Sequence, residues 1–274
     1  MSSHSDANAG RPVLSRTRPA ASGGRPAAAP GGRPATTYDR HVVLVLAVSD
    51  EVDDALLADW HAVRQAQLIV ACGDLPFEDL GQLMNRLDAP LVFVPGNHDP
   101  DISGYRISRS GLPLRAGLPA RPPWPDGAIN AEQRVVDAAG LRLAGLGGCR
   151  RYSAGPNQYT EWQQARRALA LARRARWRRF RDGRGVDVLL THAPPEGAGD
   201  GSDPPHQGFR ALHRLTTRLQ PAVLLHGHVH PHGTVPPGHR LGRTVVHNVV
   251  GRHLLEIEPG EDTRQSRSGH SHAR

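Results

Sequence analysis

Short apolar runs alternate with segments of helical periodicity along most of the chain. Five runs rich in Val, Leu and Ile predict buried strands, at residues 42–48, 68–72, 91–94, 186–190 and 223–225. Three segments with helically spaced apolar positions lie among them, at residues 54–64, 78–87 and 209–219. Continuous apolar strands flanked by helices are typical of α/β sheets, which is the fold class that this pattern predicts.

Four further runs predict strands without a helix between neighbours, at residues 135–137, 141–145, 244–249 and 254–258. We therefore expect two mixed β-sheets that face each other, with the helices outside. Residues 100–131 form a long irregular stretch rich in Pro, Gly and Arg. A stretch of this length inside a domain is typical of a functional or mobile loop.

The two ends of the chain differ in composition from its middle. Residues 1–39 combine Pro, Arg, Ala and Gly without periodicity, which predicts a disordered tail, and residues 260–274 predict a second one. Residues 40–259 are long enough for one domain with its own core. The apolar runs are too short to span a bilayer and the N-terminus lacks an apolar leader, so we expect a cytoplasmic protein with no membrane partner.

Charge and cysteine content narrow the function classes. All 34 basic residues are arginine and the net charge is +8 at pH 7, but six arginines lie in residues 1–40 and nine in 161–184. The rest of the chain is mildly acidic, so charge does not indicate a nucleic-acid-binding core. Cys72 and Cys149 lie in or beside apolar runs without zinc or disulfide spacing, which predicts buried thiols in a reducing compartment.

The arginine-rich segment 161–184 predicts one long helix. Four apolar residues fall on one helical face and three arginines lie elsewhere: Trp162, Ala165, Leu169 and Ala172, against Arg166, Arg173 and Arg176. We interpret the segment as an outer helix with a solvated basic face. A contact for nucleic acid or an acidic partner is the alternative.

Polar side chains follow directly after each of the five buried strands. They lie in the stretches SDEVDD, GDLP, PGNHD, THAPP and HGHVH, which begin at residues 49, 73, 95, 191 and 226. Because ligands bind at the carboxyl ends of strands in α/β sheets, we expect these groups to converge. Carboxylate, amide oxygen and imidazole together suit Mn, Fe, Zn or Ni, so the stretches predict a metal site.

These stretches resemble the signature blocks of the calcineurin-like metallophosphoesterases. Four of the five blocks of that superfamily occur in order: GD at residues 73–74, GNHD at 96–99, His192 in THAPP, and GHVH at 227–230. The resemblance covers roughly residues 41–258. It implies a four-layer α/β/β/α sandwich, in which two facing mixed β-sheets are flanked by helices, and a site for two divalent metal ions.

The resemblance also implies a role for each motif residue. Asp74 is expected to bridge the two ions. Asn97, His192 and His228 are expected to complete one site, and Asp50 and His230 to belong to the other. The catalytic residues implied are His98, which faces the phosphoryl group without binding metal, and Asp99, which orients a neighbouring group.

The first signature block departs from the family pattern of Asp, any residue, His. Here Asp50 is followed by Glu51 and Val52, and valine cannot bind a metal. A bacterial branch of the family with this SDEVD form favours Asp53 as the replacement ligand, whereas an N-cap at Asp53 or Asp54 is the alternative. An oxygen ligand in place of nitrogen favours Mn²⁺ or Mg²⁺ over Zn²⁺. We expect Glu51 to point into solvent.

Three further sets of residues near the motifs carry weaker expectations. His206 follows THAPP, and we interpret it as a surface histidine, with reach into the site as the alternative. Asp203 is a candidate cap for the helix at 209–219. One arginine of the loop after GNHD is a hypothetical phosphate contact: Arg106, Arg109, Arg115 or Arg121.

The function implied is hydrolysis of a phosphate mono- or diester by in-line attack of a metal-bridging hydroxide. Two divalent ions are expected, Mn²⁺ first, with Fe, Mg, Ni and Zn as alternatives, and the expected substrate is a phosphorylated small molecule or nucleotide. Two other interpretations stay open: a non-catalytic scaffold or regulator of the same fold, and a metal-dependent nuclease that uses the arginine-rich helix. The retained His98–Asp99 pair favours an enzyme. The sequence makes no statement about oligomeric state.

Overall fold

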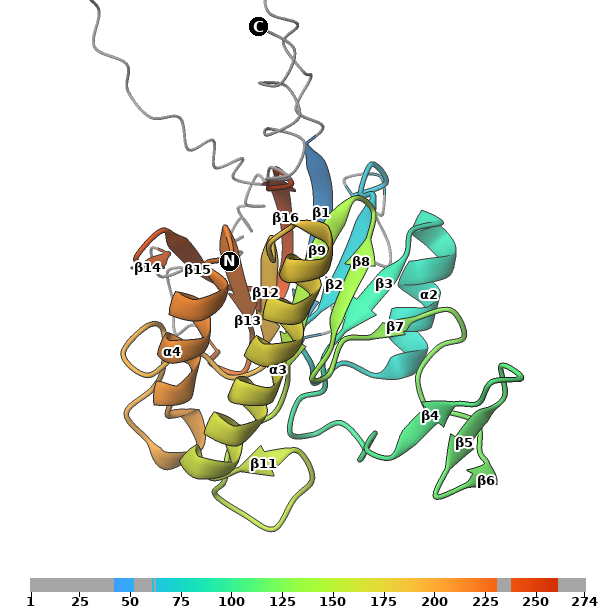
Figure 1. The fold of residues 1–274 in the computed structure, drawn as a ribbon, viewed down its shortest axis with the longest axis horizontal. Coiled ribbons are helices and arrows are strands. Elements are labelled where there is room, and N and C mark those ends of the chain that lie inside the picture. The colour runs from blue at the N-terminus through green and yellow to red at the C-terminus, as the bar shows by residue number, and fades with distance from the viewer. Residues whose placement is uncertain (1–41, 52–60, 62, 231–237, 261–274) are drawn as a thin grey trace, which may run out of the picture. The chain divides into compact units, whose positions relative to one another are not determined.

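The computed structural model describes residues 42–51, 61, 63–230 and 238–260 (Figure 1). The chain divides into residues 1–39 and residues 40–274, and all described residues lie in the second part. The helix expected at 54–64 lies outside the described residues apart from positions 61, 63 and 64. Both expected tails lie outside them as well, apart from Gly260.

The first sheet has five strands in the order β16-β1-β2-β3-β7. Their bounds are β1 (Val43–Ser49), β2 (Leu68–Ala71), β3 (Leu91–Phe93), β7 (Ile129–Asn130) and β16 (Gly251–Ile257). Strands β1, β2, β3 and β7 run parallel, and β16 pairs antiparallel along the whole of β1, from Gly251 opposite Ser49 to Ile257 opposite Val43. The parallel strands therefore end at one edge of the sheet.

The second sheet has six strands in the order β14-β15-β13-β12-β9-β8. Their bounds are β8 (Val135–Ala138), β9 (Leu141–Leu146), β12 (Val188–Thr191), β13 (Val223–His226), β14 (His239–Leu241) and β15 (Thr244–Asn248). The four central strands are parallel, and the two outer strands β8 and β14 are antiparallel to their neighbours. Both sheets are mixed, as the sequence predicts.

The helices and sheets form four layers (Figure 1). Three apolar clusters lie between these layers. The central cluster joins the facing sheets, with Val45 and Val70 of the first and Leu143 and Leu190 of the second. A second cluster packs the six-stranded sheet against α3 (Glu161–Asp182) and α4 (Arg210–Leu219). The third packs α2 (Phe77–Leu87) against the five-stranded sheet. This order confirms the α/β/β/α sandwich.

The arginine-rich helix α3 is fixed by caps at both ends and by a buried face that differs from the predicted one. Thr160 and Gln163 form a capping box at its start, and Gly183 ends it in a left-handed conformation. Its buried residues are Gln164, Ala168, Leu171, Ala172 and Ala175. The prediction that Trp162 and Leu169 share the face of Ala172 is therefore wrong. Most residues on the buried side are alanines, whereas Trp162 and Leu169 lie on the exposed side.

The stretch 100–131 contains more regular structure than predicted. It forms a small antiparallel sheet of β4 (Tyr105–Ile107), β5 (Pro113–Arg115) and β6 (Leu118–Pro119), followed by β7. These strands have two or three residues each, too few to leave a periodic signal. Arg115 pairs with Asp101 and Arg121 with Asp126. Neither of these two arginines lines the pocket described below.

The remaining short elements complete the described chain. They are β10 (Cys149–Arg150), β11 (Gln158–Tyr159) and the 3-10 helix η2 (Pro204–His206). Asp203 precedes η2 and not α4, whose N-terminal position is Phe209. Cys72 and Cys149 are buried and unpaired, as predicted. Among the described residues, no helix has the length and apolar content needed to cross a membrane.

Candidate metal centre

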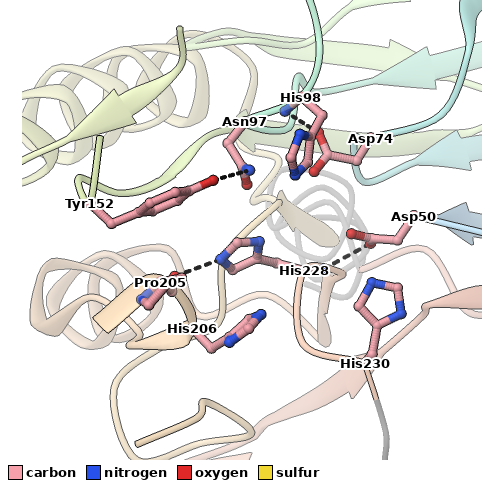
Figure 2. A pocket seen from close by; sticks show the side chains of 9 residues that line it. All are labelled: Asp50, Asp74, Asn97, His98, Tyr152, Pro205, His206, His228 and His230. Atoms are coloured by element: carbon pink, nitrogen blue, oxygen red, sulfur yellow. Dashed lines mark hydrogen bonds between the residues drawn. The ribbon is translucent and has the colours of Figure 1, made fainter. Parts of the chain in front are cut away.

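The predicted ligands come from the ends of five parallel strands. Asp50 follows β1 and Asp74 follows β2, and Asn97 lies a few residues beyond β3. In the facing sheet His192 follows β12 and His228 follows β13. Because all five strands end at the same edge of the sandwich, their side chains come together. Asp50, Asp74, Asn97 and His228 line one pocket (Figure 2), and His192 is buried next to Asp74 and Asn97.

Four of these residues form a close cluster. Asp50, Asp74, His192 and His228 each offer a ligand atom, and these atoms all lie within 4.8 Å of one another. Asp50, Asp74 and His228 also line a pocket, together with Asn97, His98, Tyr152, Pro205, His206 and His230. The structure therefore brings together donors that are up to 178 positions apart in the sequence.

His192 is completely buried and both of its ring nitrogens have defined contacts. Nδ1 donates to the Cys72 carbonyl at 2.7 Å, so Nε2 is the atom that faces Asp74 and Asn97. Nε2 lies 3.2 Å from Asp74 Oδ2 and 3.0 Å from Asn97 Oδ1. Burial acts to lower the pKa of His192, but the hydrogen bond and charge of Asp74 outweigh it and raise the pKa to about 9. The proton on His192 Nε2 therefore lies between this nitrogen, Asp74 Oδ2 and Asn97 Oδ1. A metal cation can take the same position.

Asn97 owes its orientation to Tyr152. The Asn97 amide Nδ2 donates to the Tyr152 hydroxyl at 3.2 Å, which turns Oδ1 toward His192. Only the oxygen of a side-chain amide can bind a metal, because the nitrogen has no available lone pair. Tyr152 therefore selects the ligand-competent orientation.

His228 is neutral and hydrogen-bonded in a way that defines its tautomer. Burial lowers the pKa of His228 to about 4. Nε2 donates to the Pro205 carbonyl at 2.8 Å, so Nδ1 carries the lone pair. The His228 backbone N–H donates to Asp50 Oδ2 at 2.8 Å, and the Ser49 hydroxyl donates to the same oxygen at 2.5 Å. Asp50 keeps Oδ1 as the oxygen that can serve as a ligand.

Three of the four cluster residues have a left-handed backbone. The φ angles are 63° at Asp50, 56° at Asp74 and 69° at His228. Only nine described non-glycine residues have a positive φ, so this conformation is concentrated at the cluster. It costs on the order of 1–3 kcal/mol per residue and persists where the surroundings impose it, often at functional sites. The fold holds these side chains in place at the expense of local strain.

Glycines allow the loops to approach the two carboxylates. A Cβ built on Gly96 would lie 2.0 Å from Asp74 Oδ1. One built on Gly227 would lie 2.0 Å from Ser49 Oγ and 2.2 Å from Asp50 Oδ2. Both distances are far below van der Waals contact, so these positions accept no side chain without moving a carboxylate.

The substitution Gly227→Ala is expected to lower metal affinity by about 10- to 100-fold, because the new Cβ displaces the Asp50 carboxylate. Titration of metal-free protein with Mn²⁺, followed by calorimetry, measures this loss. The control is Gly185→Ala, since the added Cβ there meets nothing within 4 Å. Equal Mn²⁺ affinities of Gly227→Ala and the control would contradict the assignment of Asp50 as a ligand.

The donor set fits divalent cations. It combines carboxylate oxygens, an amide oxygen and two imidazoles with defined lone pairs, the mixture that Mn, Fe, Zn and Ni accept. Metal binding requires a neutral imidazole, so the proton on His192 Nε2 would be released on binding. The residues present are thus a candidate metal-binding group.

Comparisons with known proteins identify the family. A family model described as calcineurin-like phosphoesterase matches residues 44–232. The chain belongs to the calcineurin-like phosphoesterase family. The matched span includes all the motif residues from Asp50 to His230. No curated protein matches the chain.

Three solved structures are similar to the chain at low sequence identity. One crystal structure is 15% identical with a TM-score of 0.53, covering 81% of this chain and 100% of its own. The structure of TT1561 from Thermus thermophilus is 18% identical with a TM-score of 0.48, covering 81% of this chain and 99% of its own. The sulfate thiohydrolase SoxB from Thermus thermophilus, in complex with glycerol, is 16% identical with a TM-score of 0.35, covering 75% of this chain and 42% of its own. The first of these supports the family fold.

The two predicted catalytic residues of this phosphoesterase-family chain lie at different depths. His98 is exposed and lines the pocket, and its backbone N–H donates to Asp74 Oδ1 at 2.7 Å. Asp99 is buried, and its Oδ2 accepts from the backbone N–H groups of Gly96 at 2.7 Å and Asp74 at 3.1 Å. Burial raises the pKa of Asp99. Asp99 therefore joins the loops after β2 and β3, and the catalytic roles of both residues stay predictions.

The structure describes only part of the variant first motif, which begins at Ser49. His230 lines the pocket but lies outside the four-residue cluster, and its Nδ1 is 3.0 Å from Glu51 Oε1. Glu51 is exposed, yet it contacts His230 and does not simply point into solvent as expected. Asp53 and its alternative role as a cap lie outside the described residues, as does Val52. The choice between ligand and cap stays a prediction.

Sequence reasoning missed Tyr152 and underrated His206. Tyr152 follows the two-residue strand β10 and belongs to no motif, so no signal marks it. His206 lies on η2 and lines the pocket, with its ring centroid 5.3 Å from that of His228. Its position just after THAPP was the available signal. His206 is partly exposed, in keeping with a surface histidine, and it also lines the pocket, as the alternative expectation holds.

Proposed function

We propose that the chain is a metal-dependent phosphoesterase that hydrolyses a phosphate mono- or diester. The proposal rests on one observation above all. Asp74 Oδ2, Asn97 Oδ1 and His192 Nε2 converge beside Asp50 and His228, and the chain belongs to a family whose members hydrolyse phosphate esters. Polar and ionisable groups are costly to bury, and a metal-binding role explains why the fold gathers so many of them at one place.

Two divalent ions, Mn²⁺ first, would be held by Asp74, Asn97, His192 and His228 on one side and by Asp74, Asp50 and His230 on the other. When bound, they supply positive charge for the phosphoryl oxygens and lower the pKa of a water molecule. Asp74 is suited to the first side because Oδ2 faces His192, and its proximity to Asp50 within the cluster suits it to the second side as well.

The chain itself provides the groups around the reacting phosphate. His98 presents an exposed imidazole at the wall of the pocket formed by the loop after β3 (Figure 2). An imidazole there can protonate the leaving oxygen or stabilise the charge that develops on it. Tyr152 and His206 line the same pocket and would limit the shape of the leaving group. A phosphorylated small molecule or nucleotide is the proposed substrate.

Hydrolysis of aryl phosphates tests this function. Protein freed of metal with a chelator is expected to regain hydrolysis of p-nitrophenyl phosphate or bis(p-nitrophenyl) phosphate on addition of Mn²⁺. The ratio of the two rates assigns monoesterase or diesterase activity. Inactivity with each of Mn²⁺, Fe²⁺, Mg²⁺, Ni²⁺ and Zn²⁺ would refute the proposal in favour of a scaffold.

The two buried, unpaired cysteines support the proposed cytoplasmic location.

The substitution His206→Ala is expected to raise KM by roughly tenfold with a smaller change in kcat, since it removes a pocket-lining imidazole that would contact the substrate. His206 Nδ1 lies 2.6 Å from Asp203 Oδ2, which fixes the ring and leaves Nε2 for the substrate. Steady-state kinetics with the better aryl phosphate measure the effect. His239→Ala is the control, an exposed histidine on β14. A KM equal to that of the control would exclude a role for His206 in binding.

A further inference from the structure

Helix α3 carries large side chains on its solvent face. Trp162 is 65% exposed, Trp177 58% and Phe180 82%, and Leu169 is exposed beside them. At 100° per residue, Trp162, Leu169 and Phe180 fall within about 20° of one line along the helix. Two tryptophans and a phenylalanine on one exposed helix face are uncommon, because such residues usually gain free energy from burial.

Arginines border this apolar line on both sides. Arg166, Arg173 and Arg176 are exposed and lie within about 40° of it. The Arg166 guanidinium lies 4.7 Å from the centroid of the Trp162 ring, and that of Arg181 lies 4.9 Å from the Trp177 ring. We call the set of Trp162, Arg166, Leu169, Arg173, Arg176, Trp177 and Phe180 the outer face of α3.

Three of the other arginines of α3 have partners within the fold. Arg167 pairs with Glu132 and Arg178 with Asp137, and Arg174 donates to the Gln133 carbonyl. These three lie on the side of the helix that faces the strand β8 and the loop before it.

The two acids of the helix are also committed to the fold. Glu161 accepts from the backbone N–H groups of Arg210 and Ala211 at the start of α4, and Asp182 accepts from Arg142. Within the part of the chain that the structure describes, Arg173 and Arg176 form no salt bridge. The outer face therefore presents uncompensated positive charge together with aromatic rings.

We propose that the outer face of α3 binds the surface of an anionic phospholipid membrane. Aromatic rings insert at the level of the lipid headgroups, and guanidinium groups contact the lipid phosphates. Trp162 and Phe180 are 18 positions apart, about 27 Å along the axis. A straight helix on the outside of the sandwich can lay this whole length on a flat surface (Figure 1).

Charge and shape favour this occupant over the alternatives. A second copy would bring two arginine rows together without any acid on the face, which is repulsive. Single-stranded nucleic acid is bound in grooves that track its backbone, whereas the outer face is a convex helix surface. The expectation of no membrane partner rested on apolar runs that are too short to span a bilayer. It does not bear on binding of the exposed residues Trp162 and Leu169 at a membrane surface.

Vesicle sedimentation with the full chain tests the proposal. We expect binding to phosphatidylcholine vesicles that contain about 30% phosphatidylglycerol, and little binding to pure phosphatidylcholine. Arg173→Gln with Arg176→Gln should lower the partition coefficient roughly 30-fold at about 0.1 M salt. Trp162→Ala with Phe180→Ala should lower it at least about tenfold, and this loss should persist at high salt.

The control variant is Arg240→Gln with Arg243→Gln, which removes the same charge from the exposed hairpin β14–β15. Near-wild-type binding of this control, with unchanged circular dichroism of all variants, supports the proposal. Equal losses in the control and the α3 variants would overturn it, because net charge alone would then explain binding. Absence of vesicle binding would also overturn the proposal. If the protein then binds single-stranded RNA and this binding depends on Trp162, the outer face of α3 is assigned to nucleic acid.

Discussion

Replacement of Asp74 by Asn is expected to remove metal binding and phosphoesterase activity together. Asp74 Oδ2 lies 3.2 Å from His192 Nε2, and Oδ1 accepts from the His98 backbone N–H at 2.7 Å. The amide keeps the shape of the side chain but loses the negative charge that both proposed metal sites share. Activity should fall by at least about 10³-fold, equivalent to about 4 kcal/mol of transition-state stabilisation.

Metal content and rate must be measured on the same sample. Plasma mass spectrometry after dialysis counts bound Mn²⁺, and the aryl phosphate assay gives the rate. Asp88→Asn is a matched control, because Asp88 also has a left-handed backbone, with φ of 49°, and is exposed at the end of α2. An Asp74→Asn variant with full metal content would show that Asp74 is not the shared ligand.

The fold was predictable where strands are buried on both faces. In β1, β2, β12 and β13 nearly every residue is buried, so the apolar run and the strand coincide to within one or two residues. Strand β16 begins three residues earlier than predicted, at Gly251. It lies at an edge of the sheet and includes the exposed residues Arg252 and Glu256. Half-exposed strands lack the continuous apolar signal, and their limits are set by the partner strand.

Helix α3 shows why amphipathicity alone can mislead. The sequence offers two candidate faces, one with Trp162 and Leu169 and one with Ala168 and Leu171. The protein buries the second, because small residues allow α3 to pack closely on β9 and α4. Hydrophobicity favours the larger residues, whereas shape complementarity decides the packing. That choice leaves the outer face exposed.

The site was predictable where a strand end fixes a residue and unpredictable where a loop supplies it. Asp74 and His192 follow parallel strands, and strand topology alone brings them together. Tyr152 reaches Asn97 from the loop between β10 and β11, 55 positions away. The amide orientation of Asn97 and the tautomer of His228 depend on such distant hydrogen bonds. Sequence spacing carries no record of them.

Replacement of His98 by Ala is expected to leave metal binding intact and lower the rate of hydrolysis by about 10²- to 10⁴-fold. The contact of residue 98 with Asp74 is made by its backbone N–H, which alanine retains. The side chain is exposed toward the pocket, so its loss costs little stability. Only the imidazole that is proposed to face the leaving oxygen is removed, and Mn²⁺ content should match that of the unsubstituted protein.

The dependence on the leaving group separates the two roles of this imidazole. If His98 protonates the leaving oxygen, His98→Ala should slow hydrolysis of an alkyl phosphate far more than that of p-nitrophenyl phosphate, whose leaving group needs no proton. If it stabilises charge, both substrates should slow equally, and His98→Asn should recover part of the rate because its amide still donates a hydrogen bond. Loss of metal from His98→Ala would instead show that the ring serves the metal centre. The backbone contact with Asp74 makes that outcome unexpected, because it fixes the loop independently of the side chain.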